Sequence, residues 1–227
     1  MIFKFINQVL YMKVKICGIR NLDEGKKISL LKPDAIGILV GYNKKIAPNV
    51  ISEKKAREII RNIPEKIDTF LLTDKTNSKT ITSYCKRIGN RYLQLTGDIG
   101  IEEIDKIKSR ISGIKIVKVI HINGEKSIEF SKLYEKCNSV DELLLDSRTG
   151  NKTGGTGIIH EWNISRRIAR QSRKPLWLAG GLKISNLKEA IRTVKPYGVD
   201  VETSVQNPDG SKNYYSINEF ISIAKSF

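Results

Sequence analysis

Cysteine and histidine are scarce in this chain of 227 residues, which has three cysteines and two histidines. The cysteines, Cys17, Cys85 and Cys137, are far apart and none belongs to a CxxC pair. This spacing argues against a zinc site and against a disulfide framework, so no metal is expected. Unpaired cysteines in small number fit a reducing compartment, and we predict a cytoplasmic protein.

Long hydrophobic runs are also missing, because no stretch approaches the roughly 18 apolar residues of a membrane span. Residues 1–11 are apolar but few, and no small-residue cleavage site follows them. We expect an N-terminal extension here: an extra strand or arm, a fragment of a signal, or an upstream start ahead of Met12. Residues 12–227 contain no linker or composition break and predict a single catalytic domain.

Acidic residues are outnumbered, with 24 against 40 lysines and arginines and a net charge of +16. Such a balance is compatible with a nucleic acid, an acidic membrane surface or an anionic small molecule. The lysines are mixed with acids along helical patterns, and the densest basic segment, residues 166–174, has no interleaved aromatic residues to stack on bases. We therefore expect solvated helix faces, with no nucleic acid or membrane as partner.

Short apolar runs alternate with amphipathic ones along the whole chain, a pattern typical of a parallel sheet with helical crossovers. Eight strands, each followed by a helix, predict an α/β fold with a single (β/α)₈ TIM barrel. The rival, an open doubly wound sheet, usually has a GxGxxG turn after its first strand, whereas residues 17–22 read CGIRNL. The expected strands are 13–17, 34–39, 66–72, 91–95, 115–120, 142–146, 176–179 and 198–202, and the expected helices are 23–31, 52–61, 78–88, 102–111, 127–136, 162–170, 186–195 and 216–226.

Two of the predicted strand ends have groups that can transfer protons near neutral pH. Asp146 follows three consecutive leucines, and a carboxylate is costly at the end of a buried strand unless it has a function or lies at an open mouth. Cys17 ends the first strand, and a thiol acts as a base or nucleophile once its pKa is lowered. Each residue alone has a structural explanation, but together at one mouth they indicate an acid and a base.

Glycines after the seventh predicted strand indicate an anion site. Gly180 and Gly181 directly end the strand, and in barrels the loops after the seventh and eighth strands often bind phosphate with free N–H groups and a helix N-terminus. The run 154–157 (GGTG) is a weaker signal, since a surface loop explains it equally well.

The ordered motifs resemble those of the phosphoribosylanthranilate isomerase family of tryptophan biosynthesis. The resemblance covers about residue 12 to the end, and the combination is more specific than any single motif. The similar segments are 15–19 (KICGI), 94–95 (QL), 143–147 (LLLDS), 154–157 (GGTG), Trp162, 178–182 (LAGGL), 198–201 (GVDV) and 209–213 (DGSKN).

This resemblance implies a cofactor-free Amadori rearrangement of a phosphosugar, in a monomer or a homodimer. Asp146 is then the general acid that protonates the furanose ring oxygen, and Cys17 is the general base that takes the C2′ proton of the Schiff base. It further implies that phosphate is bound at Gly180, Gly181, Thr203 and Ser204, and that Gly154, Gly155 and Asn49 line the substrate loops.

Three departures from the family pattern accompany the resemblance. Asn49 stands where the family usually has an arginine for the anthranilate carboxylate, and Lys44 or Lys45 is a possible substitute that lacks the bidentate fork. Thr96 replaces a common histidine. After the eighth strand, Glu202 and Ser204 differ from the usual Ser-Ser-Gly. Two alternatives therefore stay open: a diverged paralogue acting on another phosphosugar, and a non-catalytic phosphate-binding protein.

Overall fold

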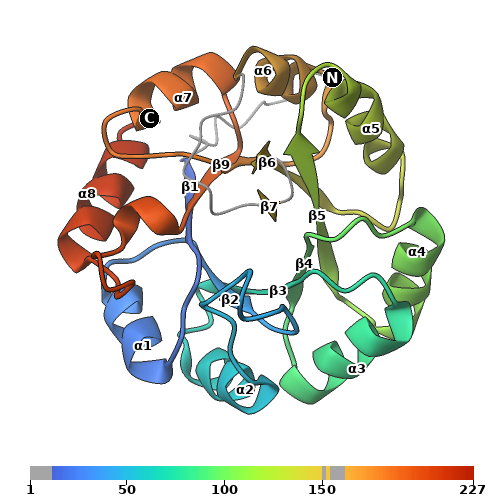
Figure 1. Ribbon diagram of the computed structural model, residues 1–227, viewed down its shortest axis with the longest axis horizontal. Helices are drawn as coiled ribbons and strands as arrows, with labels where there is room; N and C mark the ends of the chain where they lie inside the picture. The colour runs from blue at the N-terminus through green and yellow to red at the C-terminus, as the bar shows by residue number, and fades with distance from the viewer. Residues whose placement is uncertain (1–11, 150–151, 154–161) are drawn as a thin grey trace, which may run out of the picture.

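The computed structural model describes residues 12–149, 152–153 and 162–227. Its strands form one closed ring surrounded by helices (Figure 1). The strands are β1 (Lys13–Ile16), β2 (Ala35–Leu39), β3 (Asp68–Thr73), β4 (Tyr92–Leu95), β5 (Lys115–Ile122), β6 (Glu142–Thr149), β7 (Lys152–Thr153), β8 (Leu176–Leu178) and β9 (Gly198–Val201). The helices are α1 (Leu22–Leu30), α2 (Glu53–Asn62), α3 (Ser78–Ile88), α4 (Ile101–Arg110), α5 (Lys126–Glu135), α6 (Trp162–Gln171), α7 (Leu187–Val194), the 3₁₀ turn η1 (Thr203–Val205) and α8 (Tyr214–Ala224).

The ring closes through parallel pairs in the order β1-β2-β3-β4-β5-β6-β8-β9, and β9 returns to β1. This closure confirms the predicted single (β/α)₈ barrel. The main difference lies in β6, which was expected to end at Asp146 but continues to Thr149 and pairs antiparallel with β7. The register places Asp146 opposite His121. Residues 1–11 lie outside the described residues, so the expected extension stays a prediction.

Local sequence signals explain where the helices begin. Four N-terminal caps are made by a side-chain oxygen that accepts a backbone N–H three residues on, which satisfies one of the unpaired donors of the first turn. The capping residues of α1, α2, α3 and α8 are Asn21, Ser52, Asn77 and Asn213, respectively.

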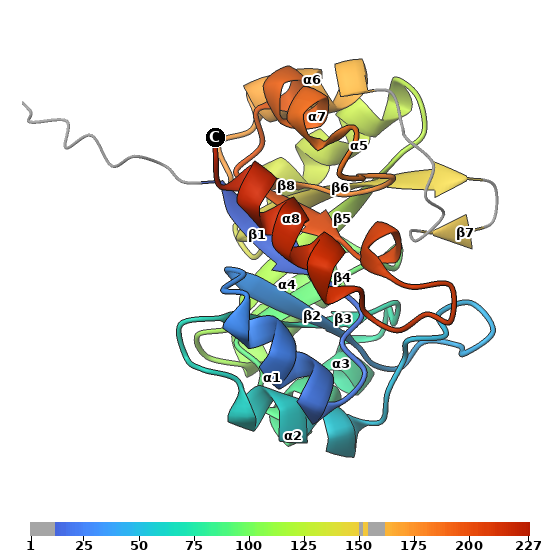
Figure 2. The same ribbon diagram turned by 90° about the vertical axis from the view of Figure 1, so that its left-hand side faces the viewer.

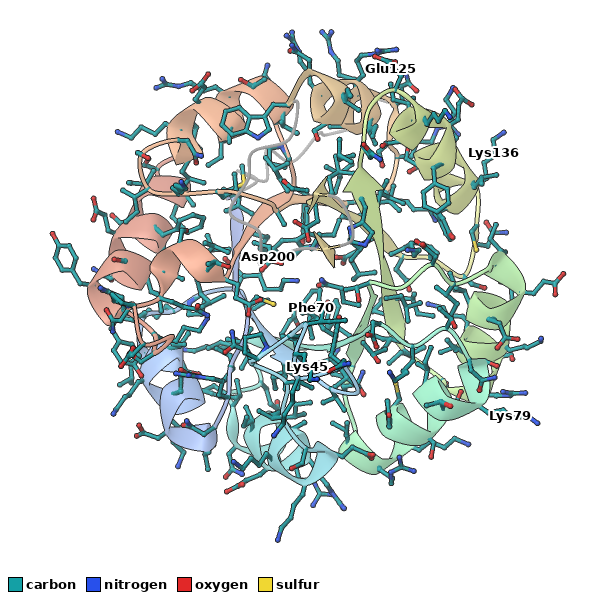
Figure 3. The ribbon with its side chains drawn as sticks, in the orientation of Figure 1. Lys45, Phe70, Lys79, Glu125, Lys136 and Asp200 are labelled. Carbon is teal, nitrogen blue, oxygen red and sulfur yellow. The ribbon has the colours of Figure 1, made fainter. Side chains whose placement is uncertain are left out.

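The strands bury two different faces, because side chains alternate along a strand. The outward face packs against the helices and is almost wholly apolar, as with Val14 and Ile16 in β1. The inward face holds Phe70 and Trp177 but also several polar groups, including Lys15 and Asp200. In Figure 3, Phe70 and Asp200 lie within the ring of strands. The polar groups of the site therefore come from inward positions.

The carboxyl ends of the parallel strands meet at one end of the barrel. Figure 2 shows the β6–β7 hairpin and the β9–α8 connection at this end, while the C-terminus and the beginning of β1 lie at the other. This mouth is where candidate functional groups gather in barrel enzymes. Among the described residues, no helix is long and apolar enough to cross a membrane.

Candidate active site

Cys17 follows β1 at the mouth and is 3% exposed. Its N–H donates to the Val201 carbonyl oxygen at 2.8 Å, which ties it to β9. Gly37 lies directly beneath it, because a Cβ at that position would overlap Cys17 Sγ. Burial raises the pKa of the Cys17 thiol well above its usual range, Asp200 and Glu202 raise it further, and Lys15 and Lys212 oppose them. These surroundings therefore favour the neutral thiol form of Cys17.

Asp146 lies on β6 with Oδ1 accepting the Ser147 N–H at 2.8 Å. Gly180 packs against it with φ of 79°, and a Cβ there would lie 2.9 Å from Asp146 Oδ1. Only glycine combines this backbone conformation with so close an approach. Burial raises the pKa of Asp146 to about 7, and the carboxylates of Asp200 and Glu202 add to the effect. A carboxyl group with this pKa holds a proton near neutral pH, as a general acid requires.

Lys15 and Asp200 form a buried ion pair inside the ring. Lys15 Nζ lies 3.1 Å from Asp200 Oδ2, donates to Gln94 Oε1 and sits 4.6 Å from the centre of the Phe70 ring. Asp200 Oδ1 is buried and has no hydrogen-bond partner among the residues that the structure describes. Burial raises the pKa of Asp200, while Lys15 opposes that rise. The charges of Lys15 and Asp200 act on both Cys17 and Asp146. Asp200 Oδ1 is suited to accept a hydrogen bond from a substrate hydroxyl.

Glu202 brings a third carboxylate to the mouth just after β9. Its Oε1 accepts a hydrogen bond from Asn49 Nδ2 at 2.6 Å, across 153 positions of sequence. The side chain lies over Gly18, where a Cβ would come within 2.8 Å of Glu202 Cδ. Two of the departures from the family pattern, Asn49 and Glu202, are therefore joined by one hydrogen bond beside Cys17.

Lys212 supplies a second buried cation next to Cys17. It is 3% exposed and Nζ donates to the Cys17 carbonyl oxygen. Burial lowers the pKa of Lys212, while Glu202 and Cys17 favour its charged form. Lys212 and Lys15 therefore both favour a thiolate at Cys17.

The predicted phosphate residues lie in two loops that are joined to each other. Gly180 and Gly181 both have positive φ, 79° and 68°. Ser204 Oγ donates to the Leu182 carbonyl oxygen at 2.6 Å, so its hydroxyl links η1 to the β8–α7 loop. Thr203 is exposed at the start of η1. The four predicted residues thus belong to adjacent loops at the mouth.

Thr96 stands in a small hydrogen-bond network on the opposite side of the mouth. Its hydroxyl donates to the Thr73 carbonyl oxygen at 3.0 Å, so the Tyr42 hydroxyl, 2.6 Å away, donates to Thr96 Oγ1. His121 Nε2 lies 2.9 Å from the Thr96 carbonyl oxygen and therefore carries its proton on that nitrogen. This network holds the β2–α2 loop against the end of β4.

The remaining predicted substrate-loop residues divide into two groups. Gly154 and Gly155 lie outside the described residues, so their assignment stays a prediction. Lys44 and Lys45 are exposed on the β2–α2 loop. Among the described parts of the chain, no group of three or more histidine, cysteine or acidic side chains could hold a metal ion.

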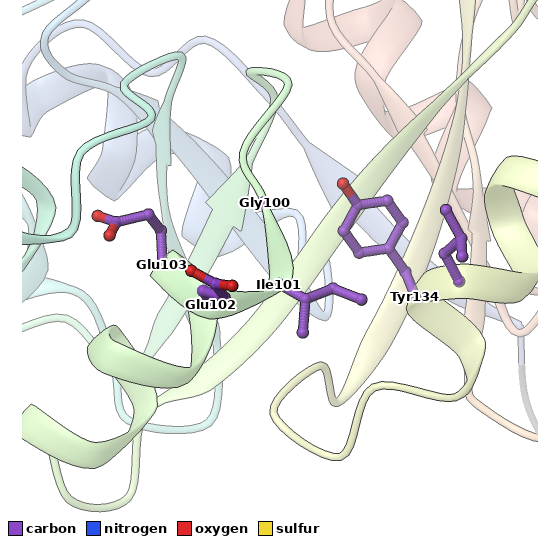
Figure 4. Close-up of a pocket in the computed structure, with 6 residues that line it drawn as sticks. Gly100, Ile101, Glu102, Glu103 and Tyr134 are labelled. Atoms are coloured by element: carbon purple, nitrogen blue, oxygen red, sulfur yellow. The ribbon is translucent and has the colours of Figure 1, made fainter.

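A separate cavity of about 430 Å³ lies on the outside of the barrel between α4 and α5 (Figure 4). It is lined by Gly100, Ile101, Glu102, Glu103, Leu133 and Tyr134. None of the candidate groups at the mouth borders it.

The sequence analysis gave no site role to four residues that lie within its family-like segments: Lys15, Gln94, Asp200 and Lys212. The first three could have been found, because a polar residue on a buried strand stands out when the inward positions are followed at a period of two. Lys15 precedes Cys17 by two residues, and Asp200 precedes Glu202 by two, so each pair shares the inward face. Lys212 lies in a loop, and no local pattern indicates that its side chain reaches Cys17.

Comparisons with known proteins concern the whole sequence and the fold. Residues 14–223 match the family model of N-(5′-phosphoribosyl)anthranilate (PRA) isomerase. N-(5′-phosphoribosyl)anthranilate isomerase 2 of Methanosarcina mazei is 33% identical over 217 residues, covering 95% of each chain. The solved structure of the isomerase from Pyrococcus furiosus is 30% identical, with a TM-score of 0.80, and covers 96% of this chain and 100% of its own. Another isomerase structure, in complex with reduced 1-(o-carboxyphenylamino)-1-deoxyribulose 5-phosphate, is 27% identical with a TM-score of 0.79 over 95% of this chain and 100% of its own.

Proposed function

Because this chain belongs to the N-(5′-phosphoribosyl)anthranilate isomerase family, we propose that Cys17 and Asp146 are the base and the acid of its reaction. The reaction is the Amadori rearrangement of N-(5-phosphoribosyl)anthranilate to 1-(2-carboxyphenylamino)-1-deoxyribulose 5-phosphate, a step of tryptophan biosynthesis. The observation that supports the assignment best is that a buried thiol at Cys17 and a carboxyl group at Asp146 share one mouth of the barrel, where burial raises the pKa of Asp146 to about 7.

Asp146 acts first in this proposal. Its protonated carboxyl donates to the furanose ring oxygen as the C1′–O4′ bond breaks, and the aryl nitrogen lone pair forms the C1′=N bond of an iminium ion. A carboxyl group that is held protonated at neutral pH by burial is suited to this donation. The carboxylate that results stays hydrogen-bonded to the Ser147 N–H.

Cys17 acts second, on the C2′–H bond. The iminium charge makes this proton acidic, and it also favours the thiolate because opposite charge lowers a thiol pKa. Lys15 and Lys212 act on the Cys17 pKa in the same direction. The thiol first releases its proton to water. The thiolate then takes the C2′ proton, which gives the enolamine. The enol O–H loses its proton as C1′ gains one, and the ketone results.

The protons balance over the whole sequence. The ring oxygen and C1′ each gain one proton, while C2′ and its hydroxyl each lose one. The product is therefore an isomer of the substrate, and no redox partner or cofactor is needed. Asp200 raises the pKa of both Cys17 and Asp146, and in this arrangement its buried Oδ1 accepts a hydrogen bond from a sugar hydroxyl.

We further propose that the phosphate is bound at Gly180, Gly181, Thr203 and Ser204. The positive φ values at both glycines and the hydrogen bond between the two loops support this placement. Gly154, Gly155 and Asn49 belong to the proposed aglycone side of the substrate. The protein is proposed to work in the cytoplasm as a monomer or a homodimer.

Turnover by purified protein tests this function. Loss of anthranilate fluorescence on addition of phosphoribosylanthranilate follows the reaction, and we expect Cys17→Ser and Asp146→Asn to abolish it while remaining folded. Cys137→Ser is the matched control, because Cys137 is also buried but lies after α5, outside the described groups of the mouth. Near-normal turnover in Cys17→Ser or Asp146→Asn would refute the assignment.

A further inference from the structure

We propose that the Asn49–Glu202 pair is a specificity element, and that it extends the substrates to phosphoribosyl arylamines whose ring bears a carboxamide in place of the carboxylate. This inference rests on the proposed function, because it takes Cys17 as the residue beside C2′. It concerns the aglycone end of the substrate and changes nothing in the proton transfers.

The position of the pair follows from the geometry around Cys17. The aryl group leaves the sugar at C1′, the atom next to C2′, whereas the phosphate is at C5′. With C2′ at Cys17 and the phosphate at the β8–α7 loop, the ring lies beside Cys17 toward the β2–α2 loop. Glu202 lies over Gly18, and Asn49 reaches it from that loop at 2.6 Å. The pair therefore borders the ring.

The charge of the pair is opposite to what an anionic aglycone needs. Among the described residues, no lysine or arginine forms a salt bridge with Glu202, and its hydrogen bond comes from the neutral amide of Asn49. Asp146 holds a proton near neutral pH and Asp200 is paired with Lys15, so Glu202 is the carboxylate that a substrate anion meets beside Cys17. A further carboxylate on the substrate meets like charge, which weakens its binding.

The hydrogen-bonding groups of the pair are complementary to a primary carboxamide. An ionised carboxylate only accepts, so Asn49 directs Nδ2 toward Glu202 and this orientation of the amide is settled. One N–H of Asn49 is used, which leaves the second N–H for a carbonyl oxygen. Within residues 12–149, 152–153 and 162–227, Glu202 Oε2 and Asn49 Oδ1 accept no hydrogen bond, so both remain as acceptors for the –NH₂ group. A carboxylate can use only the single N–H.

The rearrangement itself tolerates this exchange. The substituent lies on the ring and takes no part in the bonds that form or break at C1′, C2′ and O4′. A carboxamide keeps the arylamine nitrogen conjugated in the same way, so iminium formation and loss of the C2′ proton proceed with the same balance of protons.

Substrate selectivity tests the proposal. The two substrates are formed by condensing ribose 5-phosphate with anthranilate or with anthranilamide, and kcat/KM is measured for each. We expect wild-type protein to turn over both. Glu202→Gln is expected to raise the ratio of kcat/KM for the carboxylate to kcat/KM for the carboxamide on the order of tenfold. Glu202 also raises the pKa of Cys17 and Asp146, and the effect of that change on proton transfer is common to both substrates and cancels in the ratio. Glu189→Gln, which removes an exposed charge on α7, is expected to leave the ratio unchanged.

Three results separate the possibilities. No turnover of the carboxamide by wild-type protein that converts the carboxylate would overturn the inference and leave the proposed function standing. An equal effect of Glu202→Gln on both substrates would also overturn it. Turnover of neither substrate by folded protein would refute the proposed function, and the inference with it. Glu202→Ser, a smaller neutral substitution, repeats the comparison if Glu202→Gln does not fold.

Discussion

Asp146→Asn is expected to make the folded protein more stable at neutral and alkaline pH while it removes activity. Burial raises the pKa of Asp146 from 3.8 to about 7. Each pKa unit corresponds to about 1.4 kcal/mol, so ionising this carboxyl group in the folded state costs up to about 4 kcal/mol. Asparagine keeps an oxygen for the Ser147 N–H and is not ionised, so it avoids this cost.

The pH dependence of the effect follows from proton binding. Between about pH 4 and pH 7 the folded protein holds a proton on Asp146 that the unfolded chain has lost, so the stability of the wild type falls as pH rises through this range. Above pH 7 the loss is complete. The stability advantage of Asp146→Asn therefore grows through this range and is constant above it.

Urea denaturation of both proteins at pH 5 and pH 8 measures this difference. We expect the free energy of unfolding of Asp146→Asn, relative to wild type, to increase by up to about 3 kcal/mol between the two values. Turnover should fall by about 10²–10⁴-fold, the usual contribution of a general acid. A variant that is no more stable than wild type at pH 8 would contradict the argument that burial holds this carboxyl group protonated.

Three further predictions follow from the same contacts. The proposed acid, Asp146, has a lower pKa than the proposed base, Cys17, so kcat/KM should rise with pH up to about 7 and fall only above the raised pKa of Cys17. A profile that falls as pH increases through 7 would show that the assignment is wrong. Lys15→Met leaves Asp200 buried without its cation and should lower the free energy of unfolding by about 3–5 kcal/mol at pH 8, as measured by urea denaturation. Gly180→Ala should raise KM strongly, whereas Gly89→Ala, which has a similar φ of 83° but open space around its Cβ, should only lose stability; equal KM values would refute a role for Gly180 at the site.

The sequence was sufficient for the barrel because its signals are local and repeated. Apolar runs of strand length alternate with amphipathic helices, and the helix caps at Asn21, Ser52 and Asn77 are side-chain contacts within three residues. The extension of β6 to Thr149 was not predicted, because Arg148 and Thr149 continue the strand by pairing with β7 rather than by hydrophobic pattern.

The site was only partly predictable, for a physical reason. Cys17 and Asp146 stand out in the sequence because Cys17 follows the short β1 strand and Asp146 follows three consecutive leucines. The contact between Asn49 and Glu202 spans 153 positions, and the Lys212 contact with Cys17 spans 195, so no local pattern reports them. Such contacts are set by closure of the barrel, and this closure turns two separate departures from the family pattern into one hydrogen-bonded pair.

The measurement that tests the proposed chemistry most directly is turnover of phosphoribosylanthranilate deuterated at C2′. Loss of fluorescence is followed for the wild type and for Cys17→Ser with deuterated and ordinary substrate. If Cys17 removes the C2′ proton, deuterium slows the wild-type reaction and Cys17→Ser shows no turnover with either substrate. Wild-type rates in Cys17→Ser, with the same sensitivity to deuterium, would show that another group removes this proton.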